Sequence, residues 1–420
     1  GAGARRRAYF GGGLVRNRVG LAGGRGSGRC SAWVLAAALA CTADGAAPLD
    51  PPPQPDERPL GLGEVSEPAE LVLADLDLYG LAPAELSVRR PVDLLLSTAR
   101  DAGEREPFQG RDVDEAQTGL FAFDWATGTT RTLIVRTPSE ASLAALRVLR
   151  DGERLYALHP VRRGGSLGTL VEEVSLAGGA LARREIDEVP EDCVAVMGGD
   201  LFFRSGDAMR AIRNVGNGGA ALEPELLGPT EACGRRLAAI AGELVALDHP
   251  TEIEPAERIA VWALSPETGA RTHSLLDVGA ADLYGPEGYR PTRFALAPDG
   301  LYAVVRDAGG LEIWFVAWAR RPGSQGGGAA PGEPPRRLTR LAVPFFAQVV
   351  PFEGSTLAID EVSHLGADGG VLAMTVRIEE QAGERRFLWN ALLVADVYRG
   401  KVDLAELGTA LTGLDVVARD

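Results

Sequence analysis

The sequence predicts an all-β protein, a β-propeller of six four-stranded antiparallel blades that follows an N-terminal signal and a disordered linker. Three observations predict it. Short apolar segments recur from about residue 90 onward, and glycine-containing turns accompany the copies. The turns recur at intervals of 40 to 51 residues, apart from one interval of 131 residues that holds a further copy. This spacing is typical of propeller blades. Because one blade cannot cover both of its faces alone, we expect the copies to pack into a closed ring.

Residues 1–41 have the composition of a bacterial secretory signal. Seven arginines and no acidic residue occupy this stretch, the apolar run SAWVLAAALA covers 31–40, and Cys41 follows. Ten apolar residues reach only about 15 Å as a helix, about half of a bilayer's hydrocarbon core, which argues against a permanent transmembrane anchor. Ala38-Leu39-Ala40 before Cys41 resembles the lipobox of bacterial lipoproteins, which implies that Cys41 is lipidated. Ordinary secretion and an uncleaved start are the alternatives.

Residues 42–68 are rich in proline and acidic side chains and contain hardly any large apolar residue. Such a segment cannot bury enough surface to order itself, so we expect an extended, disordered tether. The chain thus divides into a signal (1–41), a tether (42–68) and a propeller (69–420). This organisation predicts a location in the bacterial cell envelope or periplasm, with the lipid on Cys41 as the membrane contact, or else secretion.

The first half of each repeat is a tight turn followed by a short apolar strand. Glycine at or beside the turn supplies the positive φ that such turns need, and the following residues are those of a buried strand. The copies are VDLLLST (92–98), RDGERLYAL (150–158), GGDLFFRS (198–205), AGELVAL (241–247), APDGLYAVV (297–305) and ADGGVLAMTV (367–376).

The second half of each repeat is another strand, a turn and an outer polar strand. Alternation of apolar and polar residues gives these segments the period of a strand, and arginine and threonine in the last strand indicate an exposed edge. The copies occupy residues 119–134, 168–186, 207–226, 258–276, 311–341 and 387–407. A long β-sandwich also contains many short strands, but it does not require one unit to recur in one order. Residues 69–90 and 408–420 could form a seventh blade or supply the strand that closes the ring.

One copy of the repeat resembles a known family. Residues 293–319 and 334–341 contain Pro298-Asp299-Gly300, Asp307, Ile313-Trp314 and Arg337-Leu338-Thr339, and this order resembles the TolB-type propeller repeat. The resemblance implies a six-bladed fold and, in the bacterial envelope, a binding scaffold. The fold also includes hydrolases and dehydrogenases, so it does not by itself decide activity.

The candidate ligand-binding residues lie in loops that follow the first strand of each repeat. In this strand order, these loops open on one face of the ring, and they carry His159, Asp207, Asp248, His249 and Asp307. Two imidazoles with several carboxylates could hold a divalent metal or act in acid–base catalysis. The alternative is that each side chain only hydrogen-bonds within its own turn, since no short metal-ligand spacing accompanies the histidines.

Composition narrows the function further. Fifty-eight acidic against 43 basic residues leave a net charge of −15, which argues against a nucleic-acid binder. Neither a Gly-x-Ser-x-Gly elbow nor a Walker or dinucleotide-binding loop is found in its required setting, so we assign no catalytic residue, metal or cofactor. Cys193 and Cys233 precede strands of consecutive copies and could form a disulfide in an oxidising compartment; two free thiols are the alternative.

These features favour a non-enzymatic, envelope-anchored scaffold that binds a protein, peptide or glycan and is a monomer. Enzymatic activity stays open. The alternative is a secreted propeller enzyme, a metal-assisted hydrolase, lyase or lactonase that uses the loop histidines and aspartates together with a divalent ion. An accessory copy with a purely architectural role is a third hypothesis.

Overall fold

A computed structural model describes residues 63–65, 73–75, 87–100, 117–136, 147–152, 154–163, 166–187, 190, 193–215, 224–229, 236–248, 258–284, 292–324, 333–349, 355–407 and 411–419. The chain divides into two compact units, residues 1–45 and 46–420, and all described residues belong to the second. The predicted signal and Cys41 therefore lie outside the described residues. Of the predicted tether, only 63–65 is described.

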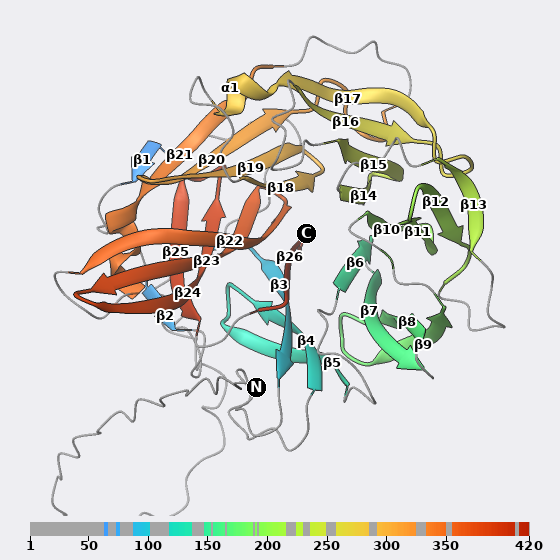
Figure 1. Cartoon of the computed structure of the whole chain (residues 1–420), viewed down its shortest axis with the longest axis horizontal. Coiled ribbons are helices and arrows are strands. Elements are labelled where there is room, and N and C mark those ends of the chain that lie inside the picture. The colour runs from blue at the N-terminus through green and yellow to red at the C-terminus, as the bar shows by residue number, and fades with distance from the viewer. Residues whose placement is uncertain are drawn as a thin grey trace, which may run out of the picture. The chain divides into compact units, whose positions relative to one another are not determined.

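The described residues form six sheets, which confirms the prediction of a six-bladed all-β propeller with four-stranded antiparallel blades. Figure 1 shows the sheets arranged around a central axis. In order from the axis outward, blade 1 contains β26 (Gly413–Ala418), β3 (Val92–Arg100), β4 (Gln117–Asp124) and β5 (Thr129–Arg136); blade 2 contains β6 (Arg147–Asp151), β7 (Arg154–Arg163), β8 (Ser166–Val174) and β9 (Ala180–Ile186); blade 3 contains β10 (Val194–Met197), β11 (Asp200–Ser205), β12 (Ala208–Ile212) and β13 (Glu225–Pro229).

The other three blades follow the same plan. Blade 4 contains β14 (Arg236–Ile240), β15 (Glu243–Asp248), β16 (Arg258–Leu264) and β17 (Arg271–Gly279), followed by helix α1 (Ala280–Tyr284); blade 5 contains β18 (Thr292–Ala297), β19 (Gly300–Asp307), β20 (Gly310–Ala317) and β21 (Arg336–Ala342), followed by a 3-10 helix (Val343–Val349); blade 6 contains β22 (Thr356–Asp368), β23 (Val371–Ala382), β24 (Arg385–Asp396) and β25 (Lys401–Leu407). Strands β1 (Gly63–Val65) and β2 (Leu73–Asp75) pair in parallel with β21 and β25.

The turns between the two innermost strands use the glycines that the sequence singled out. Gly198-Gly199 and Gly369-Gly370 both have positive φ, as tight hairpins with the twist of the flanking strands require. In blade 4 the first turn residue is Ala241, whose φ of 49° is in the left-handed region that side chains other than glycine rarely adopt.

The ring is closed by the two ends of the propeller. Strand β26 comes from the C-terminal end of the chain and pairs antiparallel with β3, as the innermost strand of blade 1. Residues 408–420 therefore supply the closing strand rather than part of a seventh blade. The residues directly before β3 are bound to blade 6. The buried Arg90 forms an ion pair of 2.8 Å with the buried Asp396, and the Val88 amide donates a hydrogen bond of 2.9 Å to Asp403.

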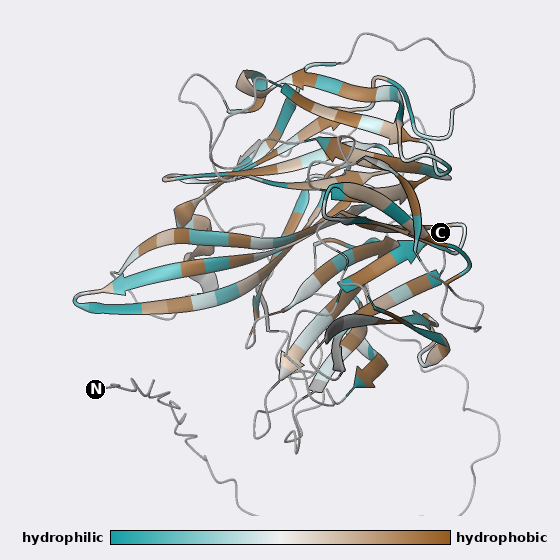
Figure 2. Cartoon of the chain, turned by 45° about the vertical axis from the view of Figure 1, so that its right-hand side comes forward, coloured by the Kyte–Doolittle hydropathy of each residue, from teal (hydrophilic) through white to brown (hydrophobic). Residues whose placement is uncertain are grey.

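Hydrophobic packing between neighbouring blades stabilises the ring. Six clusters of buried apolar residues occur among the described residues, one for each pair of adjacent blades, including the pair formed by blades 6 and 1. Figure 2 shows the alternation of polar and apolar residues along the strands, and the long β23–β24 hairpin extending beyond its neighbours. Strands covered by a neighbouring blade on both faces, such as β15 and β19, are instead buried at successive residues, and the outer strand β17 begins with exposed residues.

Cys193, directly before β10, is disulfide-bonded in the structure. Its predicted partner, Cys233, lies outside the described residues, so the pairing of these two cysteines stays a prediction. Among the described residues, the only helices are too short or too polar to span a bilayer.

Candidate functional site

The innermost strands of all six blades enclose a cavity of about 620 Å³, called here the central channel. Each of these strands is hydrogen-bonded within its sheet on one side only. The backbone N–H and C=O groups on its other side therefore face the channel, where they need water, side chains or a ligand as partners. The fold thus provides a polar lining for the channel without any special side chain.

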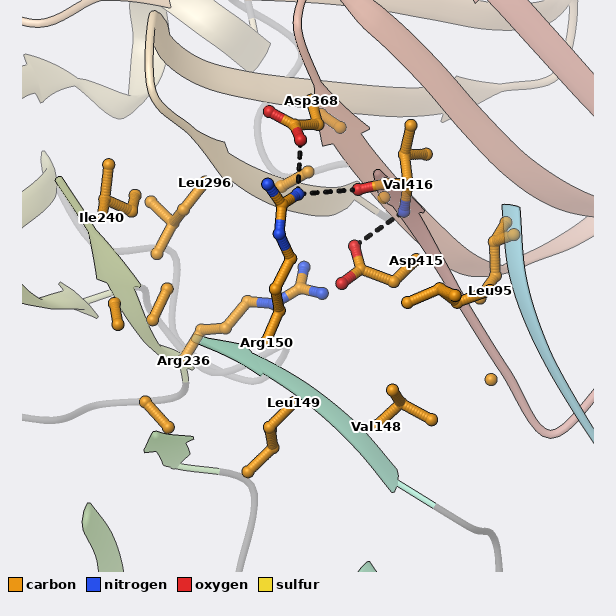
Figure 3. A pocket seen from close by; sticks show the side chains of 18 of the residues that line it. Leu95, Val148, Leu149, Arg150, Arg236, Ile240, Leu296, Asp368, Asp415 and Val416 are labelled. Atoms are coloured by element: carbon orange, nitrogen blue, oxygen red, sulfur yellow. Dashed lines mark hydrogen bonds and ion pairs between the residues drawn. The ribbon is translucent and has the colours of Figure 1, made fainter. Parts of the chain in front are cut away.

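Charged side chains from four of the innermost strands also enter the channel. Among the described residues that line it, the arginines are Arg147, Arg150 and Arg236, and the aspartates are Asp368 and Asp415. Arg147 is also bound to the protein, because its Nη1 donates a hydrogen bond of 3.4 Å to the carbonyl oxygen of Pro190. Figure 3 shows Arg150, Arg236, Asp368 and Asp415 reaching into the same space from separate strands.

Arg150 is neutralised by a neighbour. It extends from β6 in blade 2 past blade 1, and its Nη1 donates to Asp368 Oδ2 at the end of β22 in blade 6. Nη1 also lies 3.5 Å from the carbonyl oxygen of Val416 in β26. Asp368 Oδ2 accepts a second hydrogen bond, of 3.0 Å, from the Ala418 amide. This pair cross-links three blades, so we regard Arg150 and Asp368 as a structural part of the channel.

Arg236 is different, because no carboxylate of a described residue forms an ion pair with it. Among the described residues, its one hydrogen bond is 3.4 Å long and goes from Nη2 to the carbonyl oxygen of Leu365 in β22. Its side chain is exposed to the channel, while the blades around it displace much of the bulk water. This burial lowers the pKa of the Arg236 guanidinium, and Asp415 opposes the shift. Most of its five N–H donors are thus directed at the space of the channel.

Asp415 provides the acceptor group on the other side. Its Oδ1 accepts a hydrogen bond of 2.9 Å from the Val416 amide, which is its only hydrogen bond among the described residues. Burial raises the pKa of the Asp415 carboxyl, and the Val416 amide, Arg150 and Arg236 oppose this rise. The carboxylate and the Arg236 guanidinium therefore influence each other across the channel without forming an ion pair.

His364 lies in the same wall. Its Nε2 is 3.2 Å from the carbonyl oxygen of Leu411, and burial lowers the pKa of its imidazole, so the neutral ring is favoured. The rest of the wall is largely apolar, and the side chains drawn in Figure 3 include Leu95, Val148, Leu149, Ile240 and Leu296. The channel therefore combines the Arg236 guanidinium, which has no carboxylate partner among the described residues, the Asp415 carboxylate, which accepts one hydrogen bond from them, and apolar walls. This composition suits a small amphipathic ligand.

The structure places His159 inside strand β7 rather than in the loop that we expected. The side chain is 7% exposed, and its Nε2 lies 3.1 Å from Oε2 of the buried Glu172. Arg136 and Arg183 also contact this carboxylate, at 2.9 Å and 3.0 Å. His159 therefore belongs to a packed polar cluster between blades 1 and 2.

The other predicted loop residues are separate from one another. Asp207 lies in the exposed turn between β11 and β12, while Asp248 at the end of β15 pairs with Arg271 at 2.8 Å. Asp307 ends β19 and accepts a hydrogen bond of 2.7 Å from the Gly309 amide. His249 lies outside the described residues. None of the four described candidates lines the central channel, and within the described part of the chain no group of three or more His, Cys, Asp or Glu residues could hold a metal ion.

Neither Arg236 nor Asp415 is among the candidate residues predicted from the sequence. A sequence feature that could have found them is their position: both lie in an innermost strand, and a charged residue in such a strand has the channel as its nearest water. Among 43 basic residues, composition alone does not distinguish Arg236 from a surface arginine.

Neither a protein-family model nor a curated protein sequence matches the chain. Among solved structures, a protein from Lactobacillus plantarum is similar at 12% identity, with a TM-score of 0.38 over 78% of this chain and 99% of its own. A periplasmic gluconolactonase from Pseudomonas aeruginosa is similar at 15% identity, with a TM-score of 0.37 over 78% of this chain and 99% of its own. AztD from Citrobacter koseri is similar at 12% identity, with a TM-score of 0.30 over 74% and 80% of the two chains. These superpositions are too loose to indicate activity or ligand, and the TolB-type resemblance stays a prediction.

Proposed function

We propose that the protein is a non-enzymatic binding propeller of the bacterial cell envelope, and that its central channel takes up a carboxylate group of a glycan or peptide. The observation behind the proposal is the Arg236 guanidinium, which faces the central channel and makes one long hydrogen bond to the described residues. A carboxylate can accept two parallel hydrogen bonds from a guanidinium, and such a pair is stronger where water is scarce.

Arg236 supports an anionic ligand, because no carboxylate of a described residue forms an ion pair with its guanidinium. The alternative enzyme, a metal-assisted hydrolase, lyase or lactonase that uses His159 and His249, has less support, because His159 is already directed at the buried Glu172.

The test is calorimetric titration at low ionic strength with three carboxylates: glucuronate, N-acetylglutamate and cyclohexanecarboxylate. We expect at least one of them to bind, and Arg236→Gln to weaken that binding about tenfold or more, as loss of a charged bidentate contact does. Arg258→Gln, which removes an equal charge from the outside of the same blade, is the matched control and should change binding less than about twofold.

Arg236→Lys keeps the positive charge but loses the planar guanidinium that can donate two parallel hydrogen bonds. We therefore expect it to weaken carboxylate binding less than Arg236→Gln does. It also serves as a second variant if Arg236→Gln fails to fold. The proposal is wrong if the wild-type protein binds none of the three carboxylates at about 10 mM, or if Arg236→Gln binds them as the wild-type protein does.

A further inference from the structure

Asp415 is a second charged group that a ligand of the central channel meets. Its Oδ2 accepts no hydrogen bond from any described residue, and the side chain is partly exposed. Figure 3 shows its carboxylate and the Arg236 guanidinium in the same part of the channel, on strands of blades 1 and 4. Neither group forms an ion pair with a described residue. Arg236 and Asp415 therefore offer a ligand two opposite charges at separate places.

A ligand with a carboxylate alone satisfies only one of these two groups. Arg236 and Asp415 act electrostatically on each other, so a carboxylate bound to Arg236 also approaches the charge of Asp415. Like charges repel each other more strongly where the blades displace water. Arg150 does not remove this repulsion, since Asp368 already compensates its charge. A simple carboxylate should therefore bind, but less tightly than the guanidinium alone would allow.

Two kinds of donor on the ligand could satisfy Asp415, a hydroxyl group or an ammonium group. A hydroxyl group can donate to the carboxylate, but the repulsion between the two carboxylates stays. An ammonium group also donates, and its positive charge offsets the repulsion and makes the hydrogen bond a charge-assisted one. The local pair of Arg236 and Asp415 therefore favours an ammonium group.

The walls around these charges fit an aliphatic group. The side chains drawn in Figure 3 include Leu95 and Leu149. Small residues such as Ala238 and Gly366 also line the channel and leave room beside the larger ones. Removing an aliphatic group from water there would add to affinity in proportion to the apolar area buried.

We infer that the ligand of the central channel is a zwitterion of the amino-acid class, with its carboxylate on Arg236 and its ammonium group on Asp415. This inference rests on the proposed function, because it assumes that Arg236 binds the carboxylate. It adds that Asp415 determines specificity by selecting ligands with an ammonium group.

The test is calorimetric titration at neutral pH and low ionic strength with two matched series of acids. One series carries its substituent beside the carboxylate: leucine, 2-hydroxy-4-methylpentanoate and 4-methylpentanoate. The other carries it at the far end of the chain: 6-aminohexanoate, 6-hydroxyhexanoate and hexanoate. Within each series only an ammonium group, a hydroxyl group or a hydrogen differs. In at least one series, we expect the wild-type protein to bind the amino acid about fivefold or more tightly than both other members.

Asp415→Asn removes the charge and keeps the shape of the side chain. We expect it to weaken binding of the preferred amino acid but to leave or strengthen binding of the unsubstituted acid, so the preference falls to about twofold or less. A merely structural role of Asp415 would change both Kd values in the same direction. Asp277→Asn is the matched control, because Asp277 lies in the outer strand β17 and is 43% exposed; it should keep the wild-type preference.

A smaller preference of the wild-type protein in both series would overturn the inference, and this result does not require that any variant folds. An undiminished preference in Asp415→Asn would also overturn it. Both results leave the proposed function standing, because the acids still bind. If the wild-type protein binds none of the acids in the two series or in the first panel, the proposed function fails, and this inference fails with it.

Discussion

The polar cluster around Glu172 permits a sharp test of how the blades are held together. Glu172 on β8 is fully buried, and its two oxygens contact Arg136, Arg183 and His159 at distances between 2.9 and 3.2 Å. Arg136 belongs to β5 of blade 1, so the carboxylate joins two blades. Glu172→Gln keeps the size of the side chain but turns an N–H group towards guanidinium donors, where an acceptor is needed.

The size of the effect follows from the pKa of Glu172, which is about 2 in the folded protein compared with 4.5 ordinarily. Burial alone would raise this pKa, but hydrogen bonds from His159, Arg136 and Arg183 and the charge of Arg136 outweigh burial. A shift of this size corresponds to about 3 kcal/mol of stability at neutral pH. Because the folded-state pKa is lowered, this stability is present above pH 4.5 and is lost as the pH falls towards 2. We therefore expect Glu172→Gln to cost about 2–3 kcal/mol at pH 7 and less than half of that at pH 3.

The measurement is urea denaturation of both proteins at pH 7 and pH 3, followed by tryptophan fluorescence. Glu225→Gln is the control: Glu225 is 55% exposed and forms an ordinary surface ion pair with Arg213 at 3.0 Å, so its loss should cost less than about 1 kcal/mol at either pH. An equal destabilisation by Glu172→Gln at pH 7 and pH 3 would refute the reasoning, because the effect would then not arise from the charge of the carboxylate.

Three further predictions concern stability. Ala241→Gly should raise the free energy of unfolding by up to about 1 kcal/mol, measured by urea denaturation, because glycine adopts the φ of 49° without strain. Tyr398→Phe should lower the free energy of unfolding by about 1–2 kcal/mol, since the Tyr398 hydroxyl donates a hydrogen bond of 2.9 Å to the partly buried Asp299. Cys193→Ser should cost about 2–4 kcal/mol under non-reducing conditions; mass spectrometry of an unreduced digest should find Cys193 linked to Cys233.

Much of the fold could be predicted from the sequence because a propeller repeats one local pattern. The predicted segments 198–205 and 241–247 match the buried strands β11 and β15, and Gly128, Gly269 and Gly400 form the predicted outer turns with positive φ. The closure was harder to predict, because β26 pairs with β3 over more than 300 residues of sequence. No local periodicity carries information about a partner at that distance.

The site could not be predicted in the same way, because the candidate residues were chosen by residue type and not by their position in the blade. His159 was a candidate because it is a histidine, yet its strand β7 continues five residues beyond the predicted segment 150–158, and the side chain lies in the interface between two blades. A loop residue in one blade and a strand residue in another can have the same spacing from the turn. Extra strand length in β7 therefore changed the environment of the residue completely.

The position of the channel residues suggests a more general criterion for sequences of this kind. In blades 2 to 6 the innermost strand directly precedes a turn that is visible in the sequence, whereas in blade 1 it is β26, the last strand of the chain. In every blade it is the strand whose free edge faces the axis. A charged residue there must be solvated by the channel or neutralised by another blade, since its neighbours in the strand are packed in the interfaces. Arg150 meets this requirement through Asp368, whereas Arg236 and Asp415 meet it largely through the channel. Charged residues in the innermost strands are therefore better candidates for ligand contact than polar residues in the outer loops.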